Sequence, residues 1–305
     1  MNHDRALVLK AFHPQFLLLT PACFVLGWAL GVASGSGVGY PQIILAFIGA
    51  LAAHVSVNGF NEYFDYRSGL DERTNKTPFS GGSGVLQARP DLAPWVLVFS
   101  GMAFGITLMA GAVFVWEAYN IFLLSAGLLG LFLVVAYTPW LTKNPFFCLI
   151  APGLGFGILM VGGVSFVISG QISNATWIGA LITFFVVNNL LLLNQYPDVE
   201  ADRTVGRAHF PLVYGFGKST IVYGIFSSAA YGLLLFALIL GVFPLWTVLG
   251  CLPLLCLPWV LKGALRYASS SYPQQDILFL GFNVFVAVGT PFLIALGFWF
   301  EKGGF

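Results

Sequence analysis

Charged residues are the scarcest feature of this sequence. Asp, Glu, Lys and Arg make up 8% of the 305 residues, whereas they make up about a quarter of a typical soluble domain. Hydrophobic residues account for 58%, and the mean hydropathy is +0.87. The 13 basic and 12 acidic residues leave a net charge of +1, which excludes the strongly positive field that nucleic acid requires. The composition therefore predicts an integral membrane protein, with membrane lipids and no nucleic acid as partners.

Cysteine is also rare, and its placement excludes a metal site built on thiolates. The four cysteines, Cys23, Cys148, Cys251 and Cys256, lie inside apolar runs without the spacing of metal ligands. The alternating segments of about ten residues that are typical of transmembrane barrels are missing as well. Glycine and phenylalanine are abundant, with 36 and 30 residues, and both suit helices that pack closely in lipid.

Long apolar runs determine the predicted fold. A bilayer core needs about 20 apolar residues of helix, and nine runs of about that length are bounded by charge, proline or polar clusters. We predict an all-α, polytopic membrane protein in which a single domain, residues 1–305, forms nine transmembrane helices around a central cavity with a cytoplasmic cap. Pro253 and Pro258 interrupt the eighth run. The predicted spans are Phe16–Ser34, Gln42–Asn61, Pro94–Trp116, Asn120–Tyr137, Phe146–Ser169, Ala175–Asn194, Thr220–Val242, Leu245–Leu261 and Leu278–Trp299.

The charges in the loops predict the orientation. With nine spans, twelve of the 13 basic residues fall on one side of the membrane, and only Lys302 falls on the other. Basic residues accumulate on the cytoplasmic side, so the N-terminus and the cap are predicted to be cytoplasmic. Ten of the 12 acidic residues share that side, all except Glu117 and Glu301. We therefore expect a multi-pass protein of the cell inner (plasma) membrane whose first span is an uncleaved helix.

Six of the acidic residues lie in two short segments, 58–71 and 194–207, which follow the second and sixth spans. In the first segment and the turns before it, polar residues recur at the spacing that places them on one face of a helix. Gly69 is expected to end this helix, with Asp71 in the following turn. The polar stripe consists of His54, Asn58, Asn61, Glu62 and Asp65.

The second segment repeats the pattern. Asn194, Asp198 and Asp202 are spaced four residues apart, again on one helix face, and Glu200 lies on another. Pro197 removes a backbone donor, so local unwinding is expected beside these acids. Because four spans separate the two segments, both must emerge on the same side of the membrane.

Two acidic stripes that face each other predict a bound cation between them. Unpaired carboxylates near lipid are costly, and ligands that are all oxygen favour Mg²⁺ or Ca²⁺ over Zn²⁺. Mg²⁺ usually shares phosphate oxygens with a substrate. The basic residues in the surrounding loops suit a phosphorylated anion. Carboxylates, Mg²⁺ and flanking cations together predict a diphosphate site.

Alternative interpretations apply to several of these residues. A single acidic residue at a helix end is usually solvated or a cap, and His54 alone is more often a packing residue than a ligand. A transporter or magnesium channel would also cross the membrane many times, but it places ionisable residues near the bilayer midplane, where these spans have almost none. A scaffold without chemistry would not need two magnesium-type segments.

The two segments resemble the aspartate-rich motifs of the UbiA superfamily of intramembrane prenyltransferases. Residues 58–71 read NGFNEYFDYRSGLD and resemble the first motif, and residues 194–207 read NQYPDVEADRTVGR and resemble the second. Asp71, the stretch SGGSGVLQ at 80–87 and Tyr137-Thr-Pro139 are similar to the branch that transfers a polyprenyl chain to 1,4-dihydroxy-2-naphthoate in menaquinone biosynthesis. The resemblance covers nearly the whole chain.

This resemblance implies an enzyme, a Mg²⁺-dependent prenyltransferase, whose partners are a polyprenyl diphosphate and an aromatic acceptor. It also implies roles for residues at matching positions. Asn61, Asp65, Asp198 and Asp202 are expected to hold Mg²⁺ and the diphosphate, with Asp71 as the displaced third acid of the first motif. A separate hypothesis, which the resemblance does not imply, is that Asp71 is catalytic and helps to deprotonate the acceptor. Phosphate contacts are expected from Lys10, Arg67, Lys76, Lys143 and Arg207. The substrate pocket is expected to include Asn58, Tyr63, Tyr137, Asn194 and Tyr196.

Several positions depart from the family pattern, and they leave the acceptor open. Gly69 stands where many relatives have a further aspartate, Glu62 where the branch often has aspartate, and Phe156 where a glutamate is expected. His209 and Val213 replace an expected threonine and arginine. The alternative acceptors are 4-hydroxybenzoate, homogentisate and a glycerol-phosphate lipid, and a terpene cyclase of the same superfamily would need none.

Overall fold

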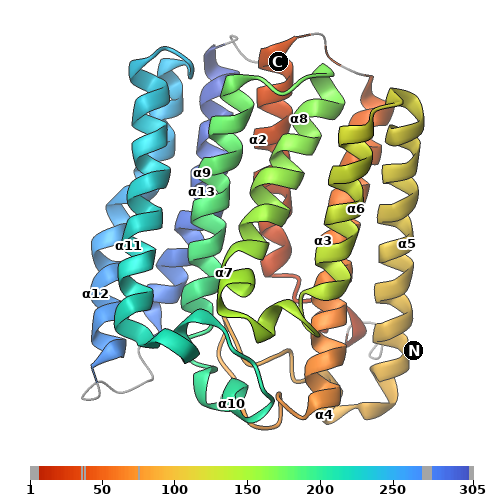
Figure 1. The fold of residues 1–305 in the computed structure, drawn as a ribbon, viewed down its shortest axis with the longest axis vertical. Helices are drawn as coiled ribbons and strands as arrows, with labels where there is room; N and C mark the ends of the chain where they lie inside the picture. The colour runs from red at the N-terminus through yellow and green to blue at the C-terminus, as the bar shows by residue number, and fades with distance from the viewer. Residues whose placement is uncertain (1–6, 36, 38, 75, 270–276, 302–305) are drawn as a thin grey trace.

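The computed structural model describes residues 7–35, 37, 39–74, 76–269 and 277–301. Within these ranges the chain folds into helices that run along one another as a bundle, with α11 and α12 on one flank and α5 and α6 on the other (Figure 1). The elements are η1 (Phe16–Leu18), α2 (Leu19–Ser34), α3 (Tyr40–Ser68), α4 (Val85–Ala88), η2 (Pro90–Leu92), α5 (Ala93–Ala118), α6 (Ile121–Ala136), η3 (Leu141–Lys143), α7 (Pro145–Gly153), η4 (Leu154–Val161), α8 (Gly162–Ser169), α9 (Asn174–Asn194), α10 (Val199–Thr204), α11 (Phe210–Ile239), η5 (Leu245–Cys256), α12 (Leu257–Ala268) and α13 (Leu278–Glu301).

Eight helical segments of the described chain are long and apolar enough to cross a membrane, so the predicted all-α membrane fold is confirmed but the predicted count of nine is not. The segment predicted as the fourth span is α6, which has only 16 residues, about 24 Å of helix. Only Ala136 of α6 is buried, whereas 12 of the 21 residues of α9 are buried. α9 is therefore a central helix of the bundle, and α6 lies at its periphery.

Two spans contain long segments that are π-helical or 3₁₀-helical, and proline and glycine account for both. The fifth span is α7, a π-helical segment η4 and α8, with Pro152 inside α7. A Cβ atom at Gly157 would lie 2.5 Å from the backbone nitrogen of Phe184, so only glycine permits this approach to α9. In the eighth span, Pro253 lies in η5, which is 3₁₀-helical, and α-helix begins only at Leu257. The predicted interruption of the eighth span is therefore confirmed.

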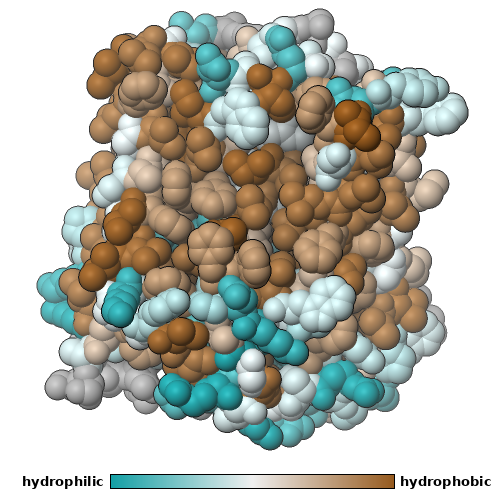
Figure 2. Space-filling model, in the orientation of Figure 1, coloured by the Kyte–Doolittle hydropathy of each residue, from teal (hydrophilic) through white to brown (hydrophobic). Residues whose placement is uncertain are grey.

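The outer surface of the bundle is apolar, as lipid contact requires. Figure 2 shows hydrophobic residues across the middle of the molecule and hydrophilic residues at both ends, most of them at the end that carries α4 and α10. Exposed aromatic side chains include Trp95, Phe122 and Phe132, which are 57%, 80% and 50% exposed. Exposed apolar side chains at this density are stable in lipid but not in water.

The polar end of the bundle is formed by the segments that follow α3 and α9. α3 continues past the predicted boundary to Ser68, and Gly69 ends it in the left-handed conformation (φ 72°), as predicted. The helix ends nearest Glu117 and Glu301 lie at the opposite end of the bundle (Figure 1). The predicted loop charges Arg5 and Lys302 lie outside the described residues.

Candidate active site

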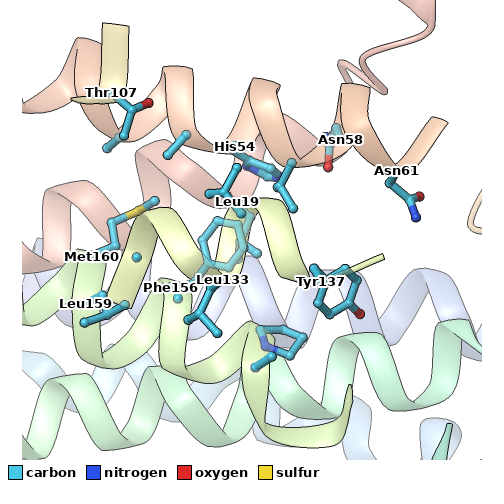
Figure 3. A pocket seen from close by; sticks show the side chains of 18 of the residues that line it. Leu19, His54, Asn58, Asn61, Thr107, Leu133, Tyr137, Phe156, Leu159 and Met160 are labelled. Carbon is cyan, nitrogen blue, oxygen red and sulfur yellow. The ribbon is translucent and has the colours of Figure 1, made fainter. Parts of the chain in front are cut away.

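A cavity of about 980 Å³ opens inside the bundle and joins the polar end to the apolar interior. Side chains of α3, α5, α6, η4 and α8 line it. Figure 3 shows Asn58, Asn61 and Tyr137 toward one end of the cavity and Thr107, Leu159 and Met160 toward the other, with His54 and Phe156 between them. The cavity therefore has a polar end, where both acidic segments meet, and a long apolar part.

The polar stripe on α3 faces this cavity, with one exception. His54, Asn58, Asn61 and Asp65 all line it. The Nδ2 atom of Asn58 donates to the carbonyl of Phe12 at 3.1 Å, and that of Asn61 donates to the hydroxyl of Thr138 at 3.1 Å. Both amides therefore have fixed donors and leave their oxygens for a ligand.

Glu62 is the exception, and its predicted place on the stripe is wrong. One residue beyond Asn61, it turns away from the cavity and is 1% exposed. Its Oε2 atom accepts from the backbone nitrogen of Ser83 at 3.1 Å and lies 3.0 Å from Nε2 of His13. The hydroxyl of Ser83 donates to Oε1. Glu62 thus joins α3 to the N-terminal segment and to the loop before α4.

The second acidic segment reaches the cavity through a break in the helix. α9 ends at Asn194, a turn containing Pro197 follows, and α10 begins at Val199, which confirms the predicted unwinding. Because the turn keeps near-helical backbone angles, Asn194, Asp198 and Asp202 still line the cavity together. The Oδ1 atoms of Asn194 and Asp198 are buried and accept no hydrogen bond.

Arg207 connects the two acidic segments. Its guanidinium pairs with Asp65, 142 residues away, and donates to Oδ1 of Asp202 at 3.0 Å. Burial alone would lower the pKa of Arg207, but the carboxylates of Asp65 and Asp202 raise it above its ordinary value. Arg207 therefore stays charged and lines the cavity between the two segments.

His209 is a site residue to which the sequence analysis assigned no role. It is 1% exposed, and its Nε2 atom lies 2.7 Å from Oδ2 of Asp202. Its Nδ1 atom accepts from the backbone nitrogen of Leu212, so Nε2 carries the proton and donates. This contact orients the Asp202 carboxylate, and no sequence spacing indicates it.

Asp71 lies in the turn after α3 and reaches the polar end of the cavity beneath a glycine-rich loop. It is 3% exposed, and Nε2 of Gln87 donates to its Oδ2 at 3.0 Å. Gly82 has φ of +71°, and a Cβ atom there would lie 2.6 Å from the Asp71 carboxylate. Burial, reinforced by the charges of Asp65 and Glu62, raises the pKa of Asp71 to about 7.

The pKa of Asp198 is raised further. Burial is the largest cause, and the negative charge of Asp202 adds to it, so that the pKa of Asp198 is about 8. A carboxyl group with this pKa is largely protonated at neutral pH. The protonated form is favoured only while no cation lies next to its unpartnered oxygen. A cation placed there would restore ionisation.

The other predicted phosphate contacts are not brought to the cavity. Arg207 lines the cavity, whereas the four other predicted cations are exposed and do not line the cavity: Lys10, Arg67, Lys76 and Lys143. The amine of Lys76 lies against Gly84 of the loop before α4. The roles of these four cations in substrate binding stay predictions.

Of the predicted aromatic residues, only Tyr137 lines the cavity. Tyr196 is 1% exposed and belongs to the core, where its hydroxyl donates to the carbonyl of Phe216 at 3.0 Å and its ring packs on Tyr267. Tyr63 packs with Phe12, Val85 and neighbouring residues beside α4. Both side chains support the walls from outside, and their predicted contact with substrate stays a prediction.

The arrangement suits a divalent cation that shares its ligands with a phosphate. Within the described residues, no three acidic, histidine or cysteine side chains enclose a metal ion by themselves. One end of the cavity is nevertheless lined by four oxygen-bearing side chains, those of Asp65, Asp198, Asp202 and Asn61. The buried Oδ1 atom of Asp198 has no hydrogen-bond partner and is available as a metal ligand. Oxygen ligands that leave coordination positions to water and phosphate are the usual setting of Mg²⁺.

Comparison with known proteins identifies the family of this chain. A model described as the UbiA prenyltransferase family matches residues 20–289. The chain is 24% identical over 285 residues to a 1,4-dihydroxy-2-naphthoate octaprenyltransferase from Haemophilus influenzae, with 90% of each chain covered. These two matches agree with the resemblance of the acidic segments.

Solved structures share the fold at lower identity. An apo UbiA homologue from Aeropyrum pernix K1 has a TM-score of 0.70 and 14% identity, and the match covers 94% of this chain and 98% of that one. A UbiA homologue from Archaeoglobus fulgidus, bound to GPP and Mg²⁺, has a TM-score of 0.60 and 15% identity, with 95% and 99% covered. At these identities the structures show the fold alone. Because the family model covers most of the chain and the acidic segments meet in one cavity, this protein belongs to the UbiA prenyltransferase family.

Proposed function

We propose that this protein catalyses the Mg²⁺-dependent transfer of a polyprenyl chain from polyprenyl diphosphate to an aromatic acceptor, 1,4-dihydroxy-2-naphthoate, in menaquinone biosynthesis. The observation that carries the proposal is the cavity, in which an acidic end continues into a long apolar part. A prenyl diphosphate has the same polarity along its length. The named function of the Haemophilus influenzae relative supports the choice of acceptor.

Residues of the polar end would bind the diphosphate. Asp65, Asp198, Asp202 and Asn61 would hold Mg²⁺. The solved homologue with GPP and Mg²⁺ supports the presence of the ion, not the choice of ligands. When bound, Mg²⁺ supplies positive charge that stabilises the leaving diphosphate. Arg207 already lies between the two acidic segments and would contact phosphate oxygens. His209 would hold the Asp202 carboxylate in position.

The walls of the cavity suit the bond that breaks and the bond that forms. When the allylic C–O bond breaks, its electron pair leaves with the diphosphate and the prenyl chain becomes an allylic cation. Water would quench this cation, so a cavity walled by apolar side chains protects it. The aromatic face of Tyr137, which lines the cavity, can stabilise it. The electron-rich acceptor then forms the new carbon–carbon bond and loses its carboxyl group as carbon dioxide.

Asp71 is the proposed base for the acceptor. It lines the cavity at the polar end, and its pKa of about 7 suits a general base at neutral pH. The hydrogen bond from Gln87 keeps its carboxylate in place. Asp71 would accept the proton that the acceptor hydroxyl releases as the ring becomes nucleophilic, and would return it to that oxygen after the carbon–carbon bond to the carboxyl group breaks and carbon dioxide leaves.

The proposed setting is a cell inner (plasma) membrane with the polar end in the cytoplasm. Both acidic segments and the helices α4 and α10 lie at one end of the bundle (Figure 1). A water-soluble acceptor would enter from this end, whereas the prenyl chain would arrive from the lipid. The bias of basic residues toward this end supports the cytoplasmic assignment.

The pH dependence of Mg²⁺ binding tests the proposed metal site. Since the pKa of Asp198 is raised to about 8, Mg²⁺ must displace its proton at lower pH. We expect the Mg²⁺ affinity to rise by up to about tenfold per pH unit between about pH 6 and pH 8, and then to level off. The rise in thermal unfolding temperature on adding Mg²⁺ in detergent measures this. Asp198→Asn should remove the slope, and a pH-independent affinity in the unmodified protein would contradict the assignment.

The function itself is tested with the purified protein in detergent. It would be given Mg²⁺, geranylgeranyl diphosphate and one acceptor at a time: 1,4-dihydroxy-2-naphthoate, 4-hydroxybenzoate, homogentisate or glycerol 1-phosphate. Diphosphate release and the prenylated product would be measured by mass spectrometry. We expect a product with 1,4-dihydroxy-2-naphthoate. A product with another acceptor only would show that the proposed acceptor is wrong, and so would diphosphate release in the absence of any acceptor. If no diphosphate is released under any condition, the transferase assignment is rejected.

A further inference from the structure

Two glycines on the broken fifth span line the apolar part of the cavity. Gly155 in η4 and Gly163 in α8 both lie on its wall, and a Cβ atom at either position would meet no heavy atom within 4 Å. Gly157, between them, instead packs tightly against the backbone of α9. Helix packing therefore requires glycine at 157, whereas glycine at 155 and 163 leaves open space in the cavity.

Contacts across the bundle show how far each glycine lies from the acidic end. Phe156, next to Gly155, contacts His54 of α3 with ring centroids 4.7 Å apart. His54 precedes Asp65 by eleven residues on the same helix, which is about 16 Å along its axis. Gly155 therefore lies about 16 Å from the acids that would hold the diphosphate.

Gly163 lies deeper. Its neighbour Val164 packs in one cluster with Ala46 of α3 and Phe114 of α5. Ala46 precedes Asp65 by 19 residues, which is about 28 Å along the helix axis. The cavity thus has a middle level at Gly155 and a far level at Gly163.

These depths correspond to lengths of prenyl chain. An extended chain advances about 1.2 Å per bond, so an isoprene unit of four bonds is about 5 Å long. The middle level then coincides with about the third unit from the diphosphate, and the far level with the fifth or sixth. Beyond it, the cavity ends at Trp116, Tyr119 and Ile121, which are 70%, 79% and 66% exposed, so a longer chain would continue into lipid.

We propose that Gly155 and Gly163 are specificity-determining residues, which leave room for prenyl chains to pass the middle and far levels of the cavity and so allow the protein to accept long chains. This inference rests on the proposed function only in taking a prenyl diphosphate as the substrate. A side chain at Gly155 would block the path after about three isoprene units. A side chain at Gly163 would block it after about five.

The experiment compares Gly155→Phe and Gly163→Phe with a matched control, Gly232→Phe. Gly232 is an exposed glycine of α11 that does not line the cavity and also has open space around its Cβ position. Geranyl, geranylgeranyl and octaprenyl diphosphates, with two, four and eight units, would be added with Mg²⁺ to each protein in detergent. The first measurement is thermal stabilisation by each diphosphate, which needs no acceptor, and the second is transfer to 1,4-dihydroxy-2-naphthoate.

Each variant has its own expected pattern. Gly155→Phe should keep its affinity for geranyl diphosphate and lose about tenfold or more for the two longer chains, because overpacking an apolar wall is costly. Gly163→Phe should keep the affinity for geranyl and geranylgeranyl diphosphates and lose about tenfold or more for octaprenyl diphosphate. Gly232→Phe should match the unmodified protein.

Several results would overturn the inference. Unchanged ratios between chain lengths in both variants would mean that the chain follows another path, while transfer by the unmodified protein would still support the proposed function. If no prenyl diphosphate stabilises the unmodified protein, the proposed function itself fails. Retained binding of geranyl diphosphate reports that a variant is folded, and Gly155→Leu provides a smaller substitution if Gly155→Phe does not fold.

Discussion

Asp198→Asn is expected to lower kcat by about a thousandfold or more, because it removes a charged ligand from the point where negative charge develops on the leaving group. Asp198 lines the polar end of the cavity, and its buried Oδ1 atom has no protein partner. Asparagine has nearly the same shape but cannot supply the negative charge that holds a divalent cation. Single-turnover transfer from geranylgeranyl diphosphate, measured with saturating Mg²⁺, gives the size of the effect.

The same segment offers a matched control for this substitution. Glu200 lies two residues further on, and its side chain is 84% exposed, with one weak contact to Arg203 at 3.9 Å. Glu200→Gln also removes one negative charge from the motif, yet it should leave kcat within about twofold, since an exposed charge contributes little. Equal losses in the two variants would mean that general charge, and not a ligand at Asp198, supports the reaction.

Arg207→Met is expected to lower kcat/KM for the prenyl diphosphate by about a hundredfold to a thousandfold. The substitution removes the cation that pairs with Asp65 and Asp202 and leaves these two carboxylates facing each other. Losing one partner of a buried ion pair also costs roughly 3–5 kcal/mol of folding free energy. We therefore expect a lower unfolding temperature without Mg²⁺, and a larger increase when Mg²⁺ is added, because the ion then compensates the same carboxylates.

Arg203→Met is the control for this substitution. Arg203 lies on α10, its side chain is 62% exposed, and its contact with Glu200 is at the surface. Its replacement should change neither the unfolding temperature nor kcat/KM beyond the error of measurement. Arg207→Lys should restore part of the activity, since lysine keeps the charge but cannot pair with two carboxylates in the same way. Full activity of Arg207→Met would contradict a role for this residue in binding diphosphate.

Local sequence patterns predicted the parts of the fold that depend on local chemistry. Apolar runs located the membrane helices, since a helix in lipid must bury its backbone polar groups within itself. Gly69 and Pro197 marked where α3 ends and where the second segment unwinds, because glycine adopts the left-handed conformation without strain and proline lacks a backbone donor. α6 was less well predicted, since its 16 residues are apolar but shorter than the other spans.

The limits of prediction lie where contacts join distant parts of the chain. The helical stripe correctly placed Asn58, Asn61 and Asp65 on one face, but it also included Glu62, which turns toward His13 and Ser83. Spacing alone cannot decide which edge of a stripe a neighbouring segment covers. Tyr196 shows the same limit, because its position beside an acidic motif indicated the pocket, whereas packing against Tyr267 and Phe279 places it in the core.

The sequence by itself determined that this chain belongs in a membrane, that its few charges gather at one end, and that two acidic segments emerge at that end. These features follow from hydropathy and periodicity, which act within a single helix. Only the tertiary structure decided that Arg207 bridges both segments, that His209 and Gln87 orient two of the acids, and how deep the cavity runs. These contacts do not follow from the spacing within one helix, and the pair of Arg207 and Asp65 joins residues 142 positions apart, which only helix packing brings within reach.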